Sequence, residues 1–140
     1  MDNPIEGGCL CGEVRYRVTG QSLARALYHC KTCRLASGAP SVAWVVFRSA
    51  DFAIIAGQPT RFNSSPGIVR TFCGKCGTPL TYQRTSKTDT IDVTTITLDM
   101  ADKFAPTKEV WTEHKVAWER LNDALQHYPR SSAEGAGVAT

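Results

Sequence analysis

Alternation of polar and apolar residues predicts β-strands along most of the chain. Glu13–Val18 places apolar side chains at every second position, which is typical of a strand with one buried face. Thr90–Leu98 alternates in the same way and is the clearest strand in the sequence. Apolar and β-branched runs bounded by turn-forming residues predict the other strands. These runs are Ala24–Tyr28, Ser41–Phe47, Phe52–Ala56, Thr60–Asn63, Ile68–Phe72 and Thr78–Gln83.

Helical signals are few and short. Thr32–Ser37 is expected to form one helical turn closed by Gly38, and Leu98–Ala101 is expected to form another. Glu109–Lys115 is predicted to be extended, whereas Trp118–His127 fits either a loop or a short amphipathic helix. Many short strands with few helices predict a mainly β fold.

Composition narrows the class of protein. The chain has 140 residues, of which 42% are hydrophobic and 21% charged, and this is typical of one folded domain. Its longest apolar run, Val42–Phe47, is too short to span a bilayer, and Met1–Pro4 lacks the features of a secretory signal. A cytoplasmic protein without a membrane partner is therefore expected. The net charge of +3 is dispersed, which argues against a nucleic-acid partner.

The six cysteines form three close pairs, Cys9–Cys11, Cys30–Cys33 and Cys73–Cys76. Both partners of a C-x-C or C-x-x-C pair are better placed to share one metal than to form a disulfide, and nothing in the sequence indicates export. Zinc is the metal that thiolate ligands favour by default. A redox dithiol is the alternative interpretation of a C-x-x-C pair.

Two of the pairs have the local pattern of a zinc site. Cys9 and Cys11 lie at alternate positions of an extended segment, so both sulfurs face the same side. Cys73–Gly77 reads C-x-x-C-G, the pattern of a zinc knuckle, in which Gly77 takes a left-handed conformation and backbone N–H groups point at sulfur. Two pairs make one closed site of four cysteines, although the spacing alone leaves open which two pairs share the metal.

Three stretches around these pairs carry a family resemblance. They are Gly8–Tyr16, reading G-C-L-C-G-E-V-x-Y; His29–Ala39, reading H-C-x-x-C-R-x-x-x-G-A; and Phe72–Leu80, reading F-C-x-x-C-G-x-x-L. With Asp92–Asp99 and Lys115–Trp118 they follow one another in order along the chain. Residues 5–120 resemble the glutathione-dependent formaldehyde-activating enzyme family, which also includes centromere protein V.

The resemblance implies a fold, a metal site and an activity. The implied fold is a β-tent of small antiparallel sheets pinned by a four-cysteine zinc site. Residues 121–130 form an extension beyond the resemblance, and the small and polar residues of 131–140 predict a disordered tail. The implied ligands of the structural zinc are Cys9, Cys11, Cys73 and Cys76. The implied activity is carbon–sulfur lyase chemistry on S-hydroxymethylglutathione or a related small thiol adduct.

The sequence departs from the family at the second zinc site. The family's enzymes hold this zinc with a C-x-C-x-x-C run, and here Tyr28 stands in place of the first cysteine, before Cys30 and Cys33. Three states therefore stay open, namely no second metal, a labile metal completed by water or substrate, and a bare dithiol. The resemblance implies that Cys30 and Cys33 line the active pocket, with Tyr28 and Arg34 beside them. Because Tyr28 replaces a cysteine, we expect it to act as a proton donor or hydrogen-bond partner in place of a metal ligand.

A rival hypothesis is a non-catalytic zinc-stabilised module that has lost the second zinc and binds a partner through the same cleft. Arg34 suits a carboxylate of a glutathione-like ligand, but a surface ion pair explains it equally well. A wider basic rim for an anionic tripeptide would comprise Lys31, Arg48, Arg70 and Lys75, although each of these fits a solvated surface too.

Other prominent side chains are expected to have structural roles. Trp44, Trp111 and Trp118 are expected to pack in the core and at its edge. His114 and His127 are expected to be ordinary surface or structural residues, and His29 is a pocket candidate by adjacency to Cys30. The oligomeric state is not indicated by the sequence.

Overall fold

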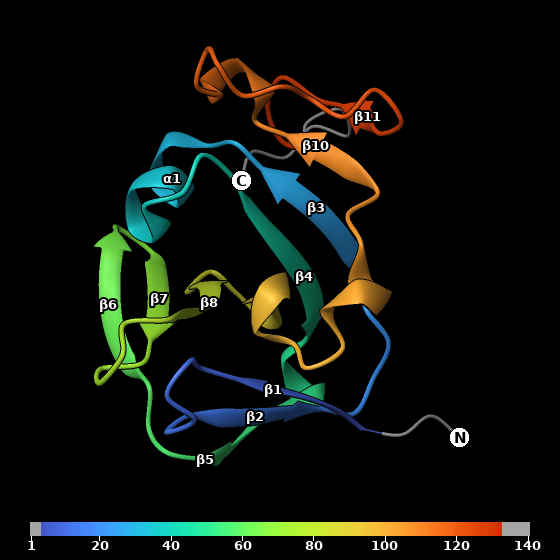
Figure 1. Ribbon diagram of the computed structural model, residues 1–140. Coiled ribbons are helices and arrows are strands. Elements are labelled where there is room, and N and C mark those ends of the chain that lie inside the picture. The colour runs from blue at the N-terminus through green and yellow to red at the C-terminus, as the bar shows by residue number, and fades with distance from the viewer. Residues whose placement is uncertain (1–3, 133–140) are drawn as a thin grey trace. The chain divides into compact units, whose positions relative to one another are not determined.

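The computed structural model describes residues 4–132. The chain forms two compact units, Met1–Ala24 with Val45–Phe104 (unit 1) and Arg25–Trp44 with Ala105–Thr140 (unit 2). Unit 1 is built mainly of strands, whereas unit 2 combines short strands and one α-helix with long connecting segments (Figure 1). The mainly β fold class is confirmed, with small sheets and one α-helix in the described residues.

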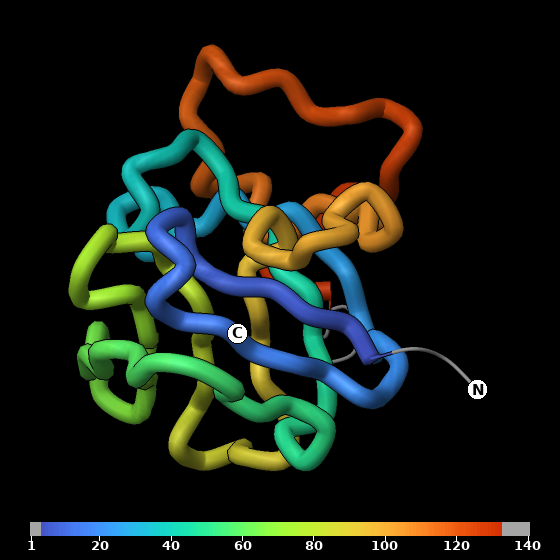
Figure 2. The backbone as a smooth tube through the Cα atoms, turned by 60° about the horizontal axis from the view of Figure 1, so that its bottom comes forward, coloured from blue at the N-terminus to red at the C-terminus, as the bar shows by residue number. Residues whose placement is uncertain are grey.

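Unit 1 contains two antiparallel sets of strands. The first is ordered β1-β2-β5 and the second is the meander β9-β8-β7-β6. Figure 2 shows the hairpin of β1 and β2 as two neighbouring blue segments. The strands are β1 (Ile5–Gly8), β2 (Arg15–Val18), β5 (Phe52–Ala56), β6 (Thr60–Ser65), β7 (Ile68–Phe72), β8 (Pro79–Arg84) and β9 (Lys87–Thr94).

The core of unit 1 follows directly from the alternation in β2. Tyr16 and Val18 are fully buried, whereas Arg17 between them is exposed. The Tyr16 ring stacks on Phe52 at 5.3 Å between centroids, and the Tyr16 hydroxyl lies 2.7 Å from the Thr97 hydroxyl. The polar end of this buried side chain is therefore satisfied, as burial requires. The other fully enclosed members of the core are Val14, Val45, Phe47, Cys73, Leu80 and Val93.

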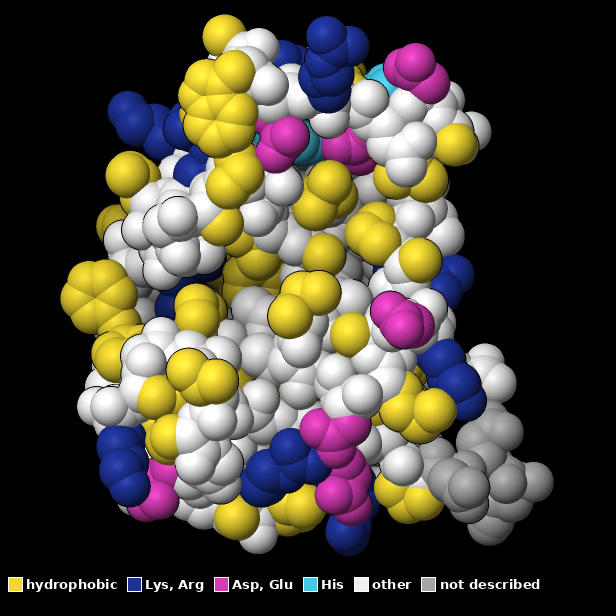
Figure 3. All heavy atoms as spheres, viewed as in Figure 1, with side chains coloured by type: hydrophobic (Ala, Val, Ile, Leu, Met, Phe, Trp, Pro, Cys, Tyr) yellow, Lys and Arg dark blue, Asp and Glu magenta, His cyan; other side chains and the backbone are white. Residues whose placement is uncertain are grey.

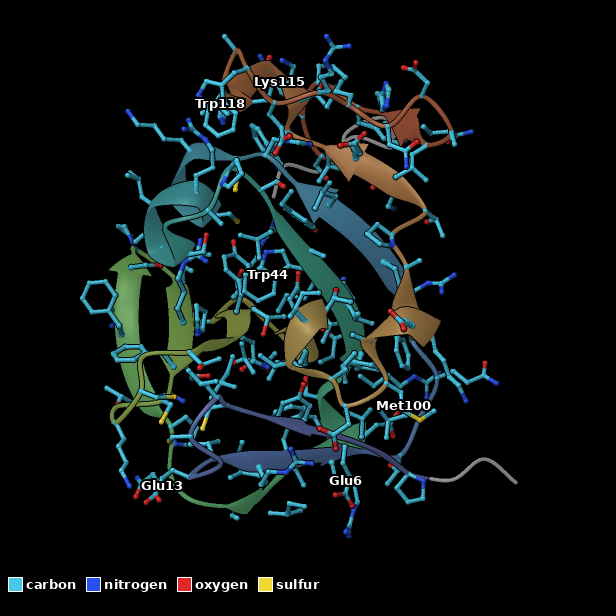
Figure 4. The ribbon with its side chains drawn as sticks, viewed as in Figure 1. Glu6, Glu13, Trp44, Met100, Lys115 and Trp118 are labelled. Carbon is cyan, nitrogen blue, oxygen red and sulfur yellow. The ribbon has the colours of Figure 1, made fainter. Side chains whose placement is uncertain are left out.

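Charged side chains of β1 and β2 pair on the surface of unit 1. Arg17 Nη2 lies 2.9 Å from Glu6 Oε2, and Arg15 Nη2 lies 2.5 Å from Asp99 Oδ2. Figure 3 shows acidic and basic side chains side by side along this edge, and Figure 4 labels Glu6 there. These pairs are exposed, so each contributes about 0–1 kcal/mol to stability.

Unit 2 is smaller and contains the helix. The chain runs through β3 (Ala24–Tyr28), α1 (Lys31–Ser37) and β4 (Val42–Arg48), and β4 continues into unit 1. The segment after residue 105 adds β10 (Lys108–Val110) and β11 (Gln126–His127). Strand β10 pairs in parallel with both β3 and β11, so these two pairings differ from the antiparallel pattern of unit 1.

Most of the predicted strands are confirmed. Three have the predicted bounds, namely β3, β5 and β7. The predicted helical turn is α1, which is about two turns long, ends at Ser37 and is followed by Gly38 with a φ of 69°. Strand β1 was not among the predicted elements, because its sequence Ile-Glu-Gly-Gly has too few apolar residues to show alternation.

The prediction is wrong at the end of the Thr90–Leu98 segment. The strand stops at Thr94, and Thr95–Thr97 forms a 3-10 turn. The Thr97 hydroxyl donates to the Thr94 carbonyl at 2.8 Å, which offers the backbone an alternative to the sheet ladder. The turn expected at Leu98–Ala101 lies instead at Ala101–Phe104.

The C-terminal segment also differs in part from expectation. Of the predicted extended segment Glu109–Lys115, only the first two residues lie in a strand, β10 (Lys108–Val110), and a 3-10 turn follows at Thr112–His114. The segment Trp118–His127 contains no helix, so of the two interpretations it is a loop that ends in β11. The predicted tail over 131–140 lies largely outside the described residues. No helix in residues 4–132 has the length and apolar content needed to cross a membrane.

Gly57 permits the tight connection between β5 and β6. Its φ is 73°, and a Cβ atom would lie 2.2 Å from the Glu13 carbonyl oxygen. We expect Gly57→Ala to destabilise the protein by about 2–4 kcal/mol, through the left-handed conformation and the clash together. Gly38→Ala is the matched control, because its φ of 69° is similar and the space around it is open. Urea unfolding of both variants measures the difference, and equal losses would contradict the prediction.

Candidate functional site

The cysteine cluster of unit 1 joins two hairpin connections. Cys9 and Cys11 lie in the turn between β1 and β2, and Cys73 and Cys76 lie in the turn between β7 and β8. Their four sulfur atoms all lie within 4.8 Å of one another. Cys11 Sγ is 3.6 Å from Cys9 Sγ and 3.7 Å from Cys73 Sγ. In Figure 4 yellow sulfur atoms lie beside the β1–β2 turn.

Both turns point backbone N–H groups at the sulfurs. The Val14 N–H donates to Cys9 Sγ at 3.3 Å, and the N–H groups of Lys75 and Cys76 each lie 3.4 Å from Cys73 Sγ. The turn after Cys76 closes through Gly77, whose φ is 83° as the knuckle pattern predicts. Such N–H donors stabilise thiolates, so the turns are shaped for ionised sulfur.

The pKa values of the clustered cysteines shift in opposite directions, because hydrogen bonds favour the thiolates while neighbouring sulfurs disfavour them. A hydrogen bond from the Thr78 hydroxyl, supported by backbone N–H groups, lowers the pKa of Cys76 to about 5. A hydrogen bond from the Glu13 backbone favours the Cys11 thiolate, but burial and the three neighbouring sulfurs together outweigh it and raise the pKa of Cys11 to about 11. Four thiolates at this spacing repel one another, and a divalent cation at their centre removes that repulsion.

The donor set fits zinc. Tetrahedral zinc has Zn–S bonds of about 2.3 Å, which places neighbouring sulfurs about 3.8 Å apart. The measured separations of 3.6 and 3.7 Å are close to this value. Among the histidine, cysteine and acidic side chains of residues 4–132, these four cysteines form the group of three or more that lie close enough together to hold a metal ion.

The Cys30–Cys33 segment lies in unit 2, and it differs from the four-cysteine cluster of unit 1 in its number of neighbouring metal ligands. Cys30 precedes the first residue of α1, and Cys33 is buried one turn later. Cys30 Sγ lies 3.7 Å from the Thr32 hydroxyl. Tyr28 is the last residue of β3 and is half-buried beside Val110 of β10. The described residues do not place a third metal-ligating side chain close to these two cysteines.

Arg34 lies in α1, and its side chain has a buried polar atom that is not hydrogen-bonded to the described residues. Its Nε is buried and has no hydrogen-bond partner among the described residues. A buried guanidinium N–H without an acceptor is costly, so a bound acceptor would stabilise it. Of the two interpretations of Arg34, this observation favours the one in which Arg34 binds a carboxylate.

Glu109 is a buried residue that no sequence motif marks. Its side chain is 1% exposed, and its Oε1 accepts a hydrogen bond of 2.7 Å from Nε2 of the fully buried His29. Its Oε2 accepts one of 2.6 Å from the Asn122 N–H and lies 3.2 Å from His127 Nε2. His29 is therefore a buried partner of Glu109. The partners are 80 residues apart in sequence, so no local pattern could have indicated the pair.

The tryptophans are not all buried. Trp44 is 4% exposed, as expected of a core residue, whereas Trp118 is 73% exposed. Figure 4 shows Trp118 on the segment that follows Thr112–His114. The prediction of a packing role is therefore wrong for Trp118. His114 is a surface residue whose ring centre lies 5.0 Å from that of Trp111, with the two ring planes tilted by 32°, and His127 is a partner of Glu109.

Comparison with known proteins places this architecture in a family. The family model of the glutathione-dependent formaldehyde-activating enzyme matches residues 4–114. The chain belongs to this family. The resemblance of the cysteine motifs is thereby confirmed, and the match includes all six cysteines of this family member.

A solved structure supports the fold of this family member. A Rhodobacter sphaeroides protein of known crystal structure is similar, with a TM-score of 0.58 and 22% sequence identity. The alignment covers 68% of this chain and 88% of that chain. No curated protein matches the chain significantly.

Proposed function

We propose that the protein is a zinc-dependent carbon–sulfur lyase that acts in the cytoplasm on S-hydroxymethylglutathione or a related small thiol adduct. The family match over residues 4–114 carries this proposal. Its structural zinc would be held by Cys9, Cys11, Cys73 and Cys76, whose geometry fits that ion. The active pocket would contain Cys30, Cys33, Tyr28 and Arg34.

The proposed reaction assigns roles to the residues of unit 2. Cleavage of the adduct breaks the carbon–sulfur bond, leaves the electron pair on sulfur and removes the hydroxyl proton as formaldehyde forms. Tyr28 would exchange that proton, and the unpartnered Nε of Arg34 would donate to a carboxylate of the substrate. A second zinc, if bound at Cys30 and Cys33, supplies a site where a thiol is held as the thiolate.

Turnover of formaldehyde and glutathione tests the proposal. We expect Cys30→Ser to remain folded and to lose at least about 100-fold in kcat/KM, since its thiol lines the reacting centre. Ala36→Ser is the control, because Ala36 is exposed on the same helix and should leave turnover unchanged. Full activity of Cys30→Ser would contradict the assignment of the pocket.

A non-catalytic zinc module is the second candidate function. It is favoured by one observation, the absence among the described residues of a third ligand near Cys30 and Cys33. An inert wild-type protein that holds about one zinc per chain would support this module, whereas about two zincs with turnover would support the lyase. A dithiol switch at Cys30 and Cys33 predicts instead that mild oxidation consumes two thiols without release of zinc.

A further inference from the structure

A cavity of about 260 Å³ lies in unit 1, where strand β5 and the β6-β7-β8-β9 meander both contribute to its lining. The register of the meander explains which side chains face it. Arg61 of β6 pairs with Thr71 of β7, and Thr71 pairs with Thr81 of β8, so these three side chains lie on one face of neighbouring strands. Figure 1 shows β6, β7 and β8 as neighbours. We call this space the meander cavity.

Much of the meander cavity is lined by apolar side chains. Val69 and Ile91 are each 8% exposed and form its buried part, and β5 contributes Phe52 and Ile54. Ile54 is 37% exposed, so a ligand in the cavity would cover apolar surface that now faces water. An apolar cavity of about 150 Å³ holds a benzene ring, so this larger one has room for a ring with a short chain.

The polar side chains deep in the meander cavity already have partners. The Thr71 and Thr81 hydroxyls lie 2.5 Å apart, and Gln83 Nε2 donates to two backbone carbonyls of β9 at 3.1 Å each. Arg61 carries the single charge among the lining residues. Its side chain is exposed, and no hydrogen bond or ion pair links it to another described residue. The guanidinium of Arg61 is therefore available to an anion.

We propose that the meander cavity binds a small aromatic monocarboxylate, whose ring occupies the apolar part and whose carboxylate pairs with Arg61. A planar guanidinium matches a carboxylate by forming two parallel hydrogen bonds. One guanidinium compensates one negative charge, whereas a phosphate monoester would leave a second charge uncompensated beside apolar side chains. The lining residues all belong to unit 1, and Cys30 and Cys33 belong to unit 2, so this inference does not depend on the proposed function.

Titration calorimetry of the full chain with 3-phenylpropanoate at pH 7.5 tests the charged end of the site. We expect a Kd of roughly 0.01–1 mM, as befits a ligand of this size. Arg61→Gln should weaken binding at least tenfold, and Arg61→Lys should weaken it less because the charge stays. Arg48→Gln is the matched control, since Arg48 is an exposed arginine of unit 1 outside the cavity lining, and it should change binding less than twofold.

Two neighbouring isoleucines test the apolar end. Ile54 lines the meander cavity, whereas Ile55 follows it on β5, points to the other face and is 42% exposed. We expect Ile54→Ser to weaken binding of 3-phenylpropanoate at least fivefold and Ile55→Ser to change it less than twofold. Both side chains are exposed to a similar extent, so both variants should fold, which circular dichroism checks.

Three further ligands separate the contributions of charge and ring. The uncharged 3-phenylpropanamide has nearly the same shape and should bind wild type at least tenfold more weakly than the acid. Acetate lacks the ring and should show no measurable binding. Phenyl phosphate should bind more weakly than 3-phenylpropanoate, because of its second charge.

Several results would overturn the site. Equal binding of acid and amide would mean that Arg61 does not recognise the charge, and equal effects of Ile54→Ser and Ile55→Ser would place the ligand outside the meander cavity. Tighter binding of phenyl phosphate would replace the carboxylate by a phosphate. No binding of 3-phenylpropanoate to wild type would exclude the site altogether.

Discussion

Cys73→Ser is expected to leave the protein unfolded at 25 °C. Cys73 is 1% exposed, belongs to the core of unit 1 and contributes one of the four clustered sulfurs. A structural zinc contributes roughly 10 kcal/mol or more of binding free energy, whereas a domain has a net stability of roughly 5–15 kcal/mol. Loss of one thiolate therefore removes most or all of the stability.

Circular dichroism and the zinc content of the purified protein measure this effect. Cys30→Ser is the control, because Cys30 lies outside the cluster and its loss should leave the melting transition and one zinc per chain in place. A strong chelator should unfold wild type in the same way as the substitution. A cooperative melt of metal-free wild type would show that the cluster is not needed for folding.

Glu109→Gln is expected to destabilise the protein by about 2–3 kcal/mol. The carboxylate binds His29 at 2.7 Å and the Asn122 N–H at 2.6 Å, and neither His29 nor Glu109 has access to water. Loss of an acceptor leaves a buried hydrogen-bond donor without a partner, and the donor's desolvation is then uncompensated. An amide also has an N–H where the carboxylate has an acceptor, so one of the two hydrogen bonds is lost.

Urea unfolding of Glu109→Gln beside Glu113→Gln tests this claim. Glu113 also pairs with a basic side chain, Arg130 at 3.2 Å, but both partners are exposed. Its substitution should cost less than about 1 kcal/mol. Similar losses for the two variants would mean that burial does not determine the contribution of Glu109.

The strands of unit 1 could be predicted because each is marked by its own residues. Alternation identifies β2, and turn-forming residues such as Pro66 and Gly67 separate β6 from β7. The end of β9 could not be predicted, because the alternating pattern continues to Leu98 while Thr94 and Thr97 turn the backbone through their hydroxyl groups.

The candidate sites differ in the same way, because some are marked by local sequence and others depend on contacts between distant residues. The cysteine cluster could be proposed from motif spacing and resemblance, since each half of it is local in sequence. The pairing of His29 with Glu109 depends on which strands become neighbours. The burial of Arg70, which is 8% exposed, is likewise a tertiary property, and the sequence alone predicts only a basic rim or a solvated surface for this residue.

The cysteine cluster also sets an order for events during synthesis. Its two halves lie at residues 9–11 and 73–76, so the second half leaves the ribosome long after the first. A nascent chain cannot close the four-sulfur cage until more than half of its length has emerged. Contacts between distant positions form slowly. If the cluster holds zinc as proposed, delivery of the ion is a late step in the maturation of unit 1, and a cell short of zinc would accumulate full-length but immature chains.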